Sequence, residues 1–142
     1  VDNEVKRSEA IQLDGSGLKV VLAEDSSSVR SMLELELQEH GFQVLSARDG
    51  KEGWELVQGN PDICLVISDV EMPSRDGLAL TKQLKDNPET NHIPVIVSSS
   101  IGDIGMKERA KYLQAEEHIT KLNLDELFSK MSSLLAAQPQ HA

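Results

Sequence analysis

Five times along the chain, a short apolar run is followed by a stretch in which apolar residues recur three and four positions apart. The apolar runs have the length of β-strands and lie at residues 18–23, 42–47, 62–68, 93–99 and 117–120. The stretches with helical spacing lie at about 26–40, 49–57, 78–85, 103–114 and 123–136. This alternation predicts an α/β fold in which a parallel five-stranded sheet carries helices on both faces, in a three-layer doubly wound arrangement.

The organised part of the chain is expected to be a single domain at residues 18–136. A length of 142 residues suits one domain with a sizeable core. Residues 1–17 lack a sustained period and end in Gly-Ser-Gly, so we expect a linker or tail there, and a C-terminal tail at 137–142. No apolar run approaches the ~20 residues that span a bilayer, and no signal-peptide pattern opens the chain. We therefore expect a cytoplasmic protein without membrane insertion.

Acidic residues dominate the charge of the chain. The sequence has 24 Asp and Glu against 14 Lys and Arg, which gives a formal net charge of −10. Nucleic-acid binding needs clustered Lys and Arg, so this balance argues against a direct nucleic-acid partner. The one cysteine, Cys64, lies inside an apolar run and is expected to be a buried thiol.

Polar side chains stand where the predicted strands end. Glu24 and Asp25 follow the first strand, Asp69 follows the third, Ser99 closes the fourth, and Lys121 follows the fifth. In an open α/β sheet, the functional crevice lies beyond the carboxyl ends of the strands. These side chains are therefore expected to share one crevice.

Each of these residues has an ordinary explanation when it is taken alone. Asp25 would serve as a helix cap, and Lys121 would form an exposed ion pair of little energy. Taken together, the three carboxylates would repel one another, and a divalent cation would remove that cost. Oxygen ligands in an incomplete cage suit Mg²⁺, which keeps some coordination sites for water and phosphate. Such a crevice fits phosphoryl transfer to a carboxylate.

Four stretches of the chain carry specific motifs in a specific order. They are VVLAEDSSSVR at 20–30, ISDVEMPSRDG at 67–77, IPVIVSSS at 93–100 and HITKL at 118–122. In this combination the chain resembles the receiver domain of two-component response regulators over residues 18–136. The resemblance implies a (βα)5 flavodoxin-like fold with strand order 2-1-3-4-5. It also implies a signalling switch that takes a phosphoryl group from a sensor histidine kinase and later hydrolyses it.

The resemblance assigns a role to each position that matches the family's motifs. Asp69 would accept the phosphoryl group, and Ser99 and Lys121 would contact it, the serine as a switch hydroxyl. Glu24, Asp25 and Asp69 would bind Mg²⁺. The backbone carbonyl of Glu71 would complete the set of protein ligands.

Four positions depart from the family's pattern. His118 stands where the family has an aromatic switch residue, and imidazole packs less area. Leu122 replaces a proline that follows the lysine in a cis bond, and a cis bond is not expected here because it costs ~3 kcal/mol without proline. Gln114 and Ser100 replace a common Gly and Ala, and Ser100 adds a hydroxyl beside the predicted phosphoryl site.

The sequence is compatible with three hypotheses about the function of this chain. The first is a phosphoacceptor receiver domain, and the second is a pseudo-receiver, a protein-interaction module that is never phosphorylated, which His118 and Leu122 favour. The third is a phosphatase-type hydrolase, which would need an aspartate where Glu71 stands. The stretches DVEMP and LTKQLKDNP are similar to receivers of CheV-type chemotaxis coupling proteins, although hybrid kinases carry such receivers too. The expected partners are therefore a histidine kinase and a downstream protein or an attached coupling domain.

Overall fold

One parallel sheet of five strands organises the protein, in the order β2-β1-β3-β4-β5. The computed structural model describes residues 14–70, 72, 76–100, 105, 109–111 and 113–137. The strands are β1 (Lys19–Ala23), β2 (Gln43–Ala47), β3 (Ile63–Asp69), β4 (Val95–Ser99) and β5 (Glu117–Thr120). The helices are α2 (Ser27–Glu39), α3 (Gly50–Gly59), α4 (Gly77–Asp86) and α6 (Leu124–Ala136). The predicted α/β fold and its strand order are confirmed.

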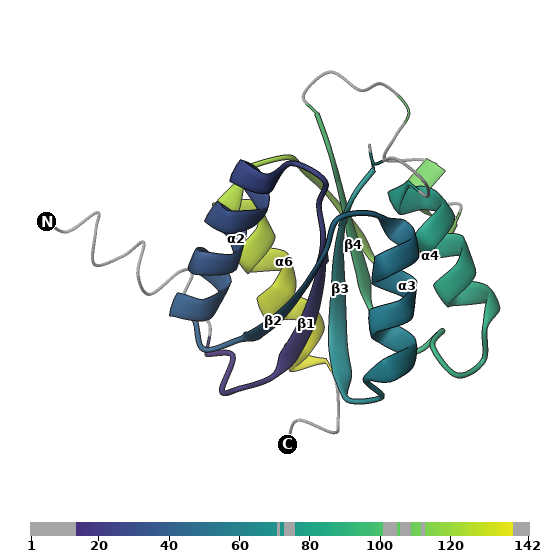
Figure 1. Cartoon of the computed structure of the whole chain (residues 1–142), viewed down its shortest axis with the longest axis horizontal. Coiled ribbons are helices and arrows are strands. Elements are labelled where there is room, and N and C mark those ends of the chain that lie inside the picture. Colours follow the sequence, from purple (N-terminus) through teal and green to yellow (C-terminus); the bar gives the residue numbers. More distant parts are fainter. Residues whose placement is uncertain are drawn as a thin grey trace, which may run out of the picture.

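Helices cover the sheet on both sides, with α2 and α6 on one face and α3 and α4 on the other (Figure 1). Because successive side chains of a strand point to opposite faces, β1 feeds both layers. Val20 and Leu22 join the core under α2 and α6, whereas Val21 and Ala23 join the core under α3 and α4. The central strand β3 is buried along its whole length, which explains the apolar run from Ile63 to Ile67.

Side-chain caps fix where the helices begin. Ser26 caps α2 by accepting a hydrogen bond from the backbone N–H of Val29 at 3.4 Å. Asp49 caps α3, and Asp76 caps α4, in the same way. Such caps satisfy backbone donors that the first helical turn leaves unpaired. Since Ser26 takes this role in α2, Asp25 is not used as a cap.

Two parts of the predicted organisation fall mainly outside the described residues. Within the predicted helix at 103–114, the described residues 109–111 are helical. The other described residues of this range, 105, 113 and 114, form turns. Of the predicted linker, residues 14–17 form a turn against the end of α2. There Gly17 donates a backbone hydrogen bond to the carbonyl of Gly41 at 2.8 Å. The end of the predicted linker is therefore fastened to the domain.

Cys64 lies on β3 with 7% of its surface exposed. Burial raises the pKa of its thiol to about 11, because the charged thiolate is poorly solvated there. The thiolate, which is the reactive form, is thus scarce at neutral pH. The predicted buried thiol is confirmed.

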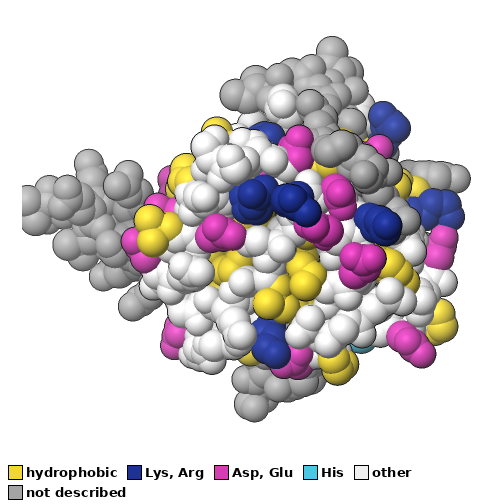
Figure 2. Space-filling view, in the orientation of Figure 1, with side chains coloured by type: hydrophobic (Ala, Val, Ile, Leu, Met, Phe, Trp, Pro, Cys, Tyr) yellow, Lys and Arg dark blue, Asp and Glu magenta, His cyan; other side chains and the backbone are white. Residues whose placement is uncertain are grey.

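Charges of both signs are interspersed over the surface in Figure 2, around a small apolar area. Three large apolar side chains are notably exposed among the described residues, namely Met32, Leu35 and Leu122. Within the described ranges, no helix has the length and apolar character needed to cross a membrane.

Gln114 adopts a left-handed backbone conformation with φ of 71°. Its N–H donates to the carbonyl of Lys111, so it ends the short helical segment before β5. We expect Gln114→Gly to raise the free energy of unfolding by about 0.5–1 kcal/mol, because glycine adopts this conformation without steric cost. Urea denaturation would measure the change. As a control, Gln38→Gly within α2 should lower the stability, and a loss of stability in both variants would contradict the explanation.

Candidate functional site

The parallel register brings the ends of four strands to one edge of the sheet. Ala23 lies opposite Ser68, so Glu24 follows β1 beside the end of β3, where Asp69 stands. Asp69 in turn lies opposite Ser98 on β4. Ser99 lies opposite Thr120 on β5, one residue before the predicted lysine. The positions predicted from strand ends therefore converge at the carboxyl edge of the sheet.

Three carboxylates meet at this edge. Glu24, Asp25 and Asp69 each offer an oxygen atom, and these atoms all lie within 4.8 Å of one another. Glu24 and Asp69 are only 2% and 3% exposed, whereas Asp25 is exposed. Hard oxygen ligands on one open side are the donor set that Mg²⁺ prefers, so the residues present fit this ion.

Backbone contacts hold Glu24 in this cluster. The N–H of Ser26 donates to Glu24 Oε2 at 2.9 Å. The guanidinium of Arg30 donates to the carbonyl oxygen of Glu24 at 2.8 Å and to that of Asp25 at 3.5 Å. Arg30 thus fixes the loop between β1 and α2. Arg30 ends the motif VVLAEDSSSVR, but its position in the sequence does not predict these contacts.

The electrostatics of Glu24 show how crowded the acids are. Burial, the largest cause, raises the pKa of Glu24 above its ordinary value, and the charges of Asp69 and Asp25 raise it further. The hydrogen bond from Ser26 and the charge of Lys121 act in the opposite direction without cancelling the effect. A divalent cation at this position would relieve the repulsion.

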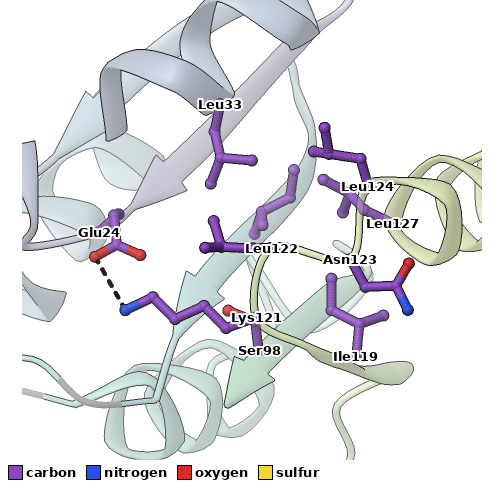
Figure 3. A pocket seen from close by; sticks show the side chains of 10 residues that line it. Glu24, Leu33, Ser98, Ile119, Lys121, Leu122, Asn123, Leu124 and Leu127 are labelled. Carbon is purple, nitrogen blue, oxygen red and sulfur yellow. Dashed lines mark ion pairs between the residues drawn. The ribbon is translucent and has the colours of Figure 1, made fainter. Parts of the chain in front are cut away.

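Lys121 provides the cation of the site. Its ammonium lies 2.9 Å from Asp69 Oδ2 and 3.6 Å from Glu24 Oε2. Desolvation opposes the ammonium charge, but the hydrogen bond to Asp69 and the nearby acids outweigh it and raise the pKa of Lys121. Figure 3 shows the lysine reaching toward Glu24, with Leu33 and Leu122 among the apolar side chains of the adjoining pocket. Apolar surroundings strengthen such ion pairs.

A tight turn presents Lys121 to the site. Thr120 accepts a hydrogen bond from the N–H of Asn123 at 3.1 Å, and Leu122 has φ of 69°. A positive φ at the third position of a β-turn is typical of type II. Proline cannot adopt this angle, so the turn is built differently from the family's Lys-Pro pattern. As expected, no cis peptide bond occurs in the part of the chain that the structure describes.

Ser99 and His118 are joined by a short hydrogen bond. Ser99 Oγ lies 2.6 Å from His118 Nε2. His118 on β5 lies opposite Val97 on β4, and Ser99 follows Val97 by two residues. The side chains of Ser99 and His118 therefore point from the same face of the sheet, on neighbouring strands. The sequence identified His118 only as a departure from an aromatic position. The sequence did not predict the hydrogen bond between His118 and Ser99. These residues are 19 positions apart, and their contact depends on the register between β4 and β5.

Gly77 lets the chain pass close to Asp69. A Cβ atom at this position would lie 2.4 Å from the carbonyl oxygen of Asp69, which is too close for any side chain. Its N–H donates to the carbonyl of Val70 at 3.1 Å. The glycine therefore allows the start of α4 to pack against the backbone of Asp69, the predicted phosphoryl acceptor. The predicted metal ligand Glu71 lies outside the described residues, and Ser100 is exposed just after β4.

The response regulator receiver domain is the family whose model matches this chain, over residues 20–132. The chain therefore belongs to this family, whose members act in two-component signalling. Among curated proteins, it is 35% identical to chemotaxis protein CheV1 of Helicobacter pylori, over 73% of this chain and 34% of that protein. It is 31% identical to CheV3 of the same organism, over 82% of this chain and 40% of that protein.

Solved structures agree with this assignment. The receiver domain of a signal transduction histidine kinase from Syntrophus aciditrophicus superposes with a TM-score of 0.76 and 31% sequence identity. The match covers 86% of this chain and 92% of that one. By contrast, this chain spans well under half of either CheV relative.

Proposed function

We propose that this chain is a Mg²⁺-dependent phosphoacceptor switch, with Asp69 as the residue that is phosphorylated. The observation that carries the proposal is the placement of Asp69. Its carboxylate is buried, contacts the Lys121 ammonium at 2.9 Å, and lies with Glu24 and Asp25 in one acidic cluster. A carboxylate with an adjacent cation and a candidate metal site has what nucleophilic phosphoryl transfer requires.

In the proposed reaction, an oxygen of the Asp69 carboxylate attacks the phosphorus of a phosphohistidine on the donor. The new O–P bond forms as the P–N bond breaks, and the imidazole leaves and takes up a proton. The Lys121 ammonium, 2.9 Å from Asp69 Oδ2, would neutralise charge on the transferred group. Hydrolysis later returns the carboxylate and releases inorganic phosphate.

Glu24, Asp25 and Asp69 would hold the ion in this proposal. When bound, Mg²⁺ supplies positive charge that stabilises the phosphoryl oxygens. Without it, Lys121 faces two buried carboxylates alone, and the approach of a further anion is opposed. The reaction should therefore depend on the divalent ion.

The partners are proposed from the relatives. A sensor histidine kinase is the phosphodonor, in the cytoplasm, where two-component signalling takes place. Because two CheV proteins are among the relatives and this chain matches only part of each, we favour a receiver attached to a chemotaxis coupling domain. A net charge of −10 supports a protein partner over nucleic acid.

A pseudo-receiver is the second candidate, and the departures at His118 and Leu122 favour it. Leu122 gives the lysine turn a geometry that proline cannot adopt. This candidate retains the fold but predicts neither metal binding nor phosphorylation. The contact between Lys121 and Asp69 favours the active receiver.

Incubation with acetyl phosphate and Mg²⁺ tests the proposal. We expect intact-mass spectrometry to show one added phosphoryl group, and we expect EDTA to prevent the addition. The product should be labile, as acyl phosphates are. No addition with acetyl phosphate or with a kinase, together with no Mg²⁺ binding, would instead support the pseudo-receiver.

A further inference from the structure

The hydroxyl of Ser99 has a defined partner in this structure. Ser99 is 2% exposed, and its Oγ lies 2.6 Å from His118 Nε2. Among the described residues, this is the one side-chain hydrogen bond found for Ser99. The serine is thus paired with a ring nitrogen before any phosphoryl group is present.

The direction of this hydrogen bond follows from the chemistry of a buried hydroxyl. A serine hydroxyl has one proton to donate, and a buried donor without an acceptor is costly. If His118 Nε2 carried a proton and donated it, the Ser99 proton would need another acceptor, and none is found among the described residues. Ser99 therefore donates to an unprotonated Nε2, and the neutral ring carries its proton on Nδ1.

We propose that His118 is a positioning residue that competes with the phosphoryl group for the single proton of Ser99. This inference rests on the proposed function, in which Ser99 donates to a phosphoryl oxygen at the site. One hydroxyl proton cannot be donated in full to both acceptors. Phosphorylation then breaks the Ser99–His118 bond, and the strength of that bond opposes phosphorylation.

His118 contacts Ser99 and also lines a cavity at the surface. The ring is partly buried on β5 and lines a cavity of about 220 Å³ together with Ala110, Lys111 and Ala115. When Ser99 turns to the phosphoryl group, the hydrogen bond between Ser99 Oγ and His118 Nε2 is broken beside this cavity.

Beryllofluoride with Mg²⁺, a stable mimic of the phosphoryl group, tests the competition on the full chain. We expect His118→Phe to bind the mimic about fivefold more tightly, since one opposing hydrogen bond is removed. In the Ser99→Ala background, the same substitution should leave the affinity unchanged. Equal or weaker binding by His118→Phe, or the same gain in both backgrounds, would overturn the proposal.

NMR spectroscopy of the wild-type chain provides a second test, which does not depend on the folding of a variant. We expect the ¹⁵N resonance of His118 Nε2 to shift when beryllofluoride binds, because that nitrogen loses its hydrogen bond. Ser99→Thr, which keeps the hydroxyl, should retain the shift. A resonance that does not move while the mimic binds would overturn the role of His118. If the wild type does not bind the mimic at all, the proposed function itself fails.

Discussion

Asp69→Asn is expected to reduce phosphorylation of this chain by acetyl phosphate by roughly 100-fold or more. The amide oxygen of asparagine is a poor nucleophile, and its attack would not yield a stable acyl phosphate. Because asparagine has nearly the same size, the fold should be retained. Intact-mass spectrometry and labelling with radioactive phosphate would measure the loss.

A matched control separates the loss of the nucleophile from the loss of one negative charge. Asp76→Asn changes the charge equally near the site, and asparagine still caps α4 as Asp76 does. We expect this control to be labelled like the wild type. Labelling that persists in Asp69→Asn would place the acceptor on another residue.

Asp25→Asn is expected to weaken Mg²⁺ binding roughly tenfold or more, because a charged oxygen ligand is replaced by a neutral one. In the proposed site Asp25 is a direct ligand, because one of its carboxylate oxygens lies within 4.8 Å of those of Glu24 and Asp69. Isothermal titration calorimetry would measure the affinity. The control is Asp62→Asn, which changes the same charge in an ion pair with Lys19, away from the acidic cluster.

The same substitution should leave the metal-free fold equally stable or slightly more stable. Burial and the charges of Asp69 and Asp25 raise the pKa of Glu24 in the fold above its ordinary value of 4.5. The stabilisation that protonated Glu24 provides is thus fully present below pH 4.5 and is lost as the pH rises above it. Removing the charge of Asp25 reduces this loss. A large destabilisation of Asp25→Asn at neutral pH would contradict the account.

The fold and the cluster of acids were accessible from the sequence for a physical reason. A strand such as β3, buried on both faces, is expected to be mainly apolar, so the charged Asp69 at its end stood out. Parallel strands then bring their carboxyl ends to one edge, which placed Glu24 and Lys121 nearby. The strand order came from the resemblance alone, since periodicity does not show which strands are neighbours.

Contacts between distant side chains could not be predicted in this way. Lys85 is a charged residue in the last turn of α4, where a solvent-exposed side chain would be expected. Its side chain is nevertheless only 5% exposed. Its ammonium donates to the carbonyl of Ile93 and to Glu116, both at 2.8 Å. Such bonds, like that of Ser99 with His118, depend on how separate elements pack, and no local pattern encodes them.

Titration of the metal-free chain with Mg²⁺, followed by amide resonances, tests the central claim most directly. We predict that one ion binds and that the largest shifts fall on Glu24, Asp25, Asp69 and Lys121. Shifts spread over other acidic surfaces, or no saturable binding in the millimolar range, would show that these carboxylates do not form a magnesium site.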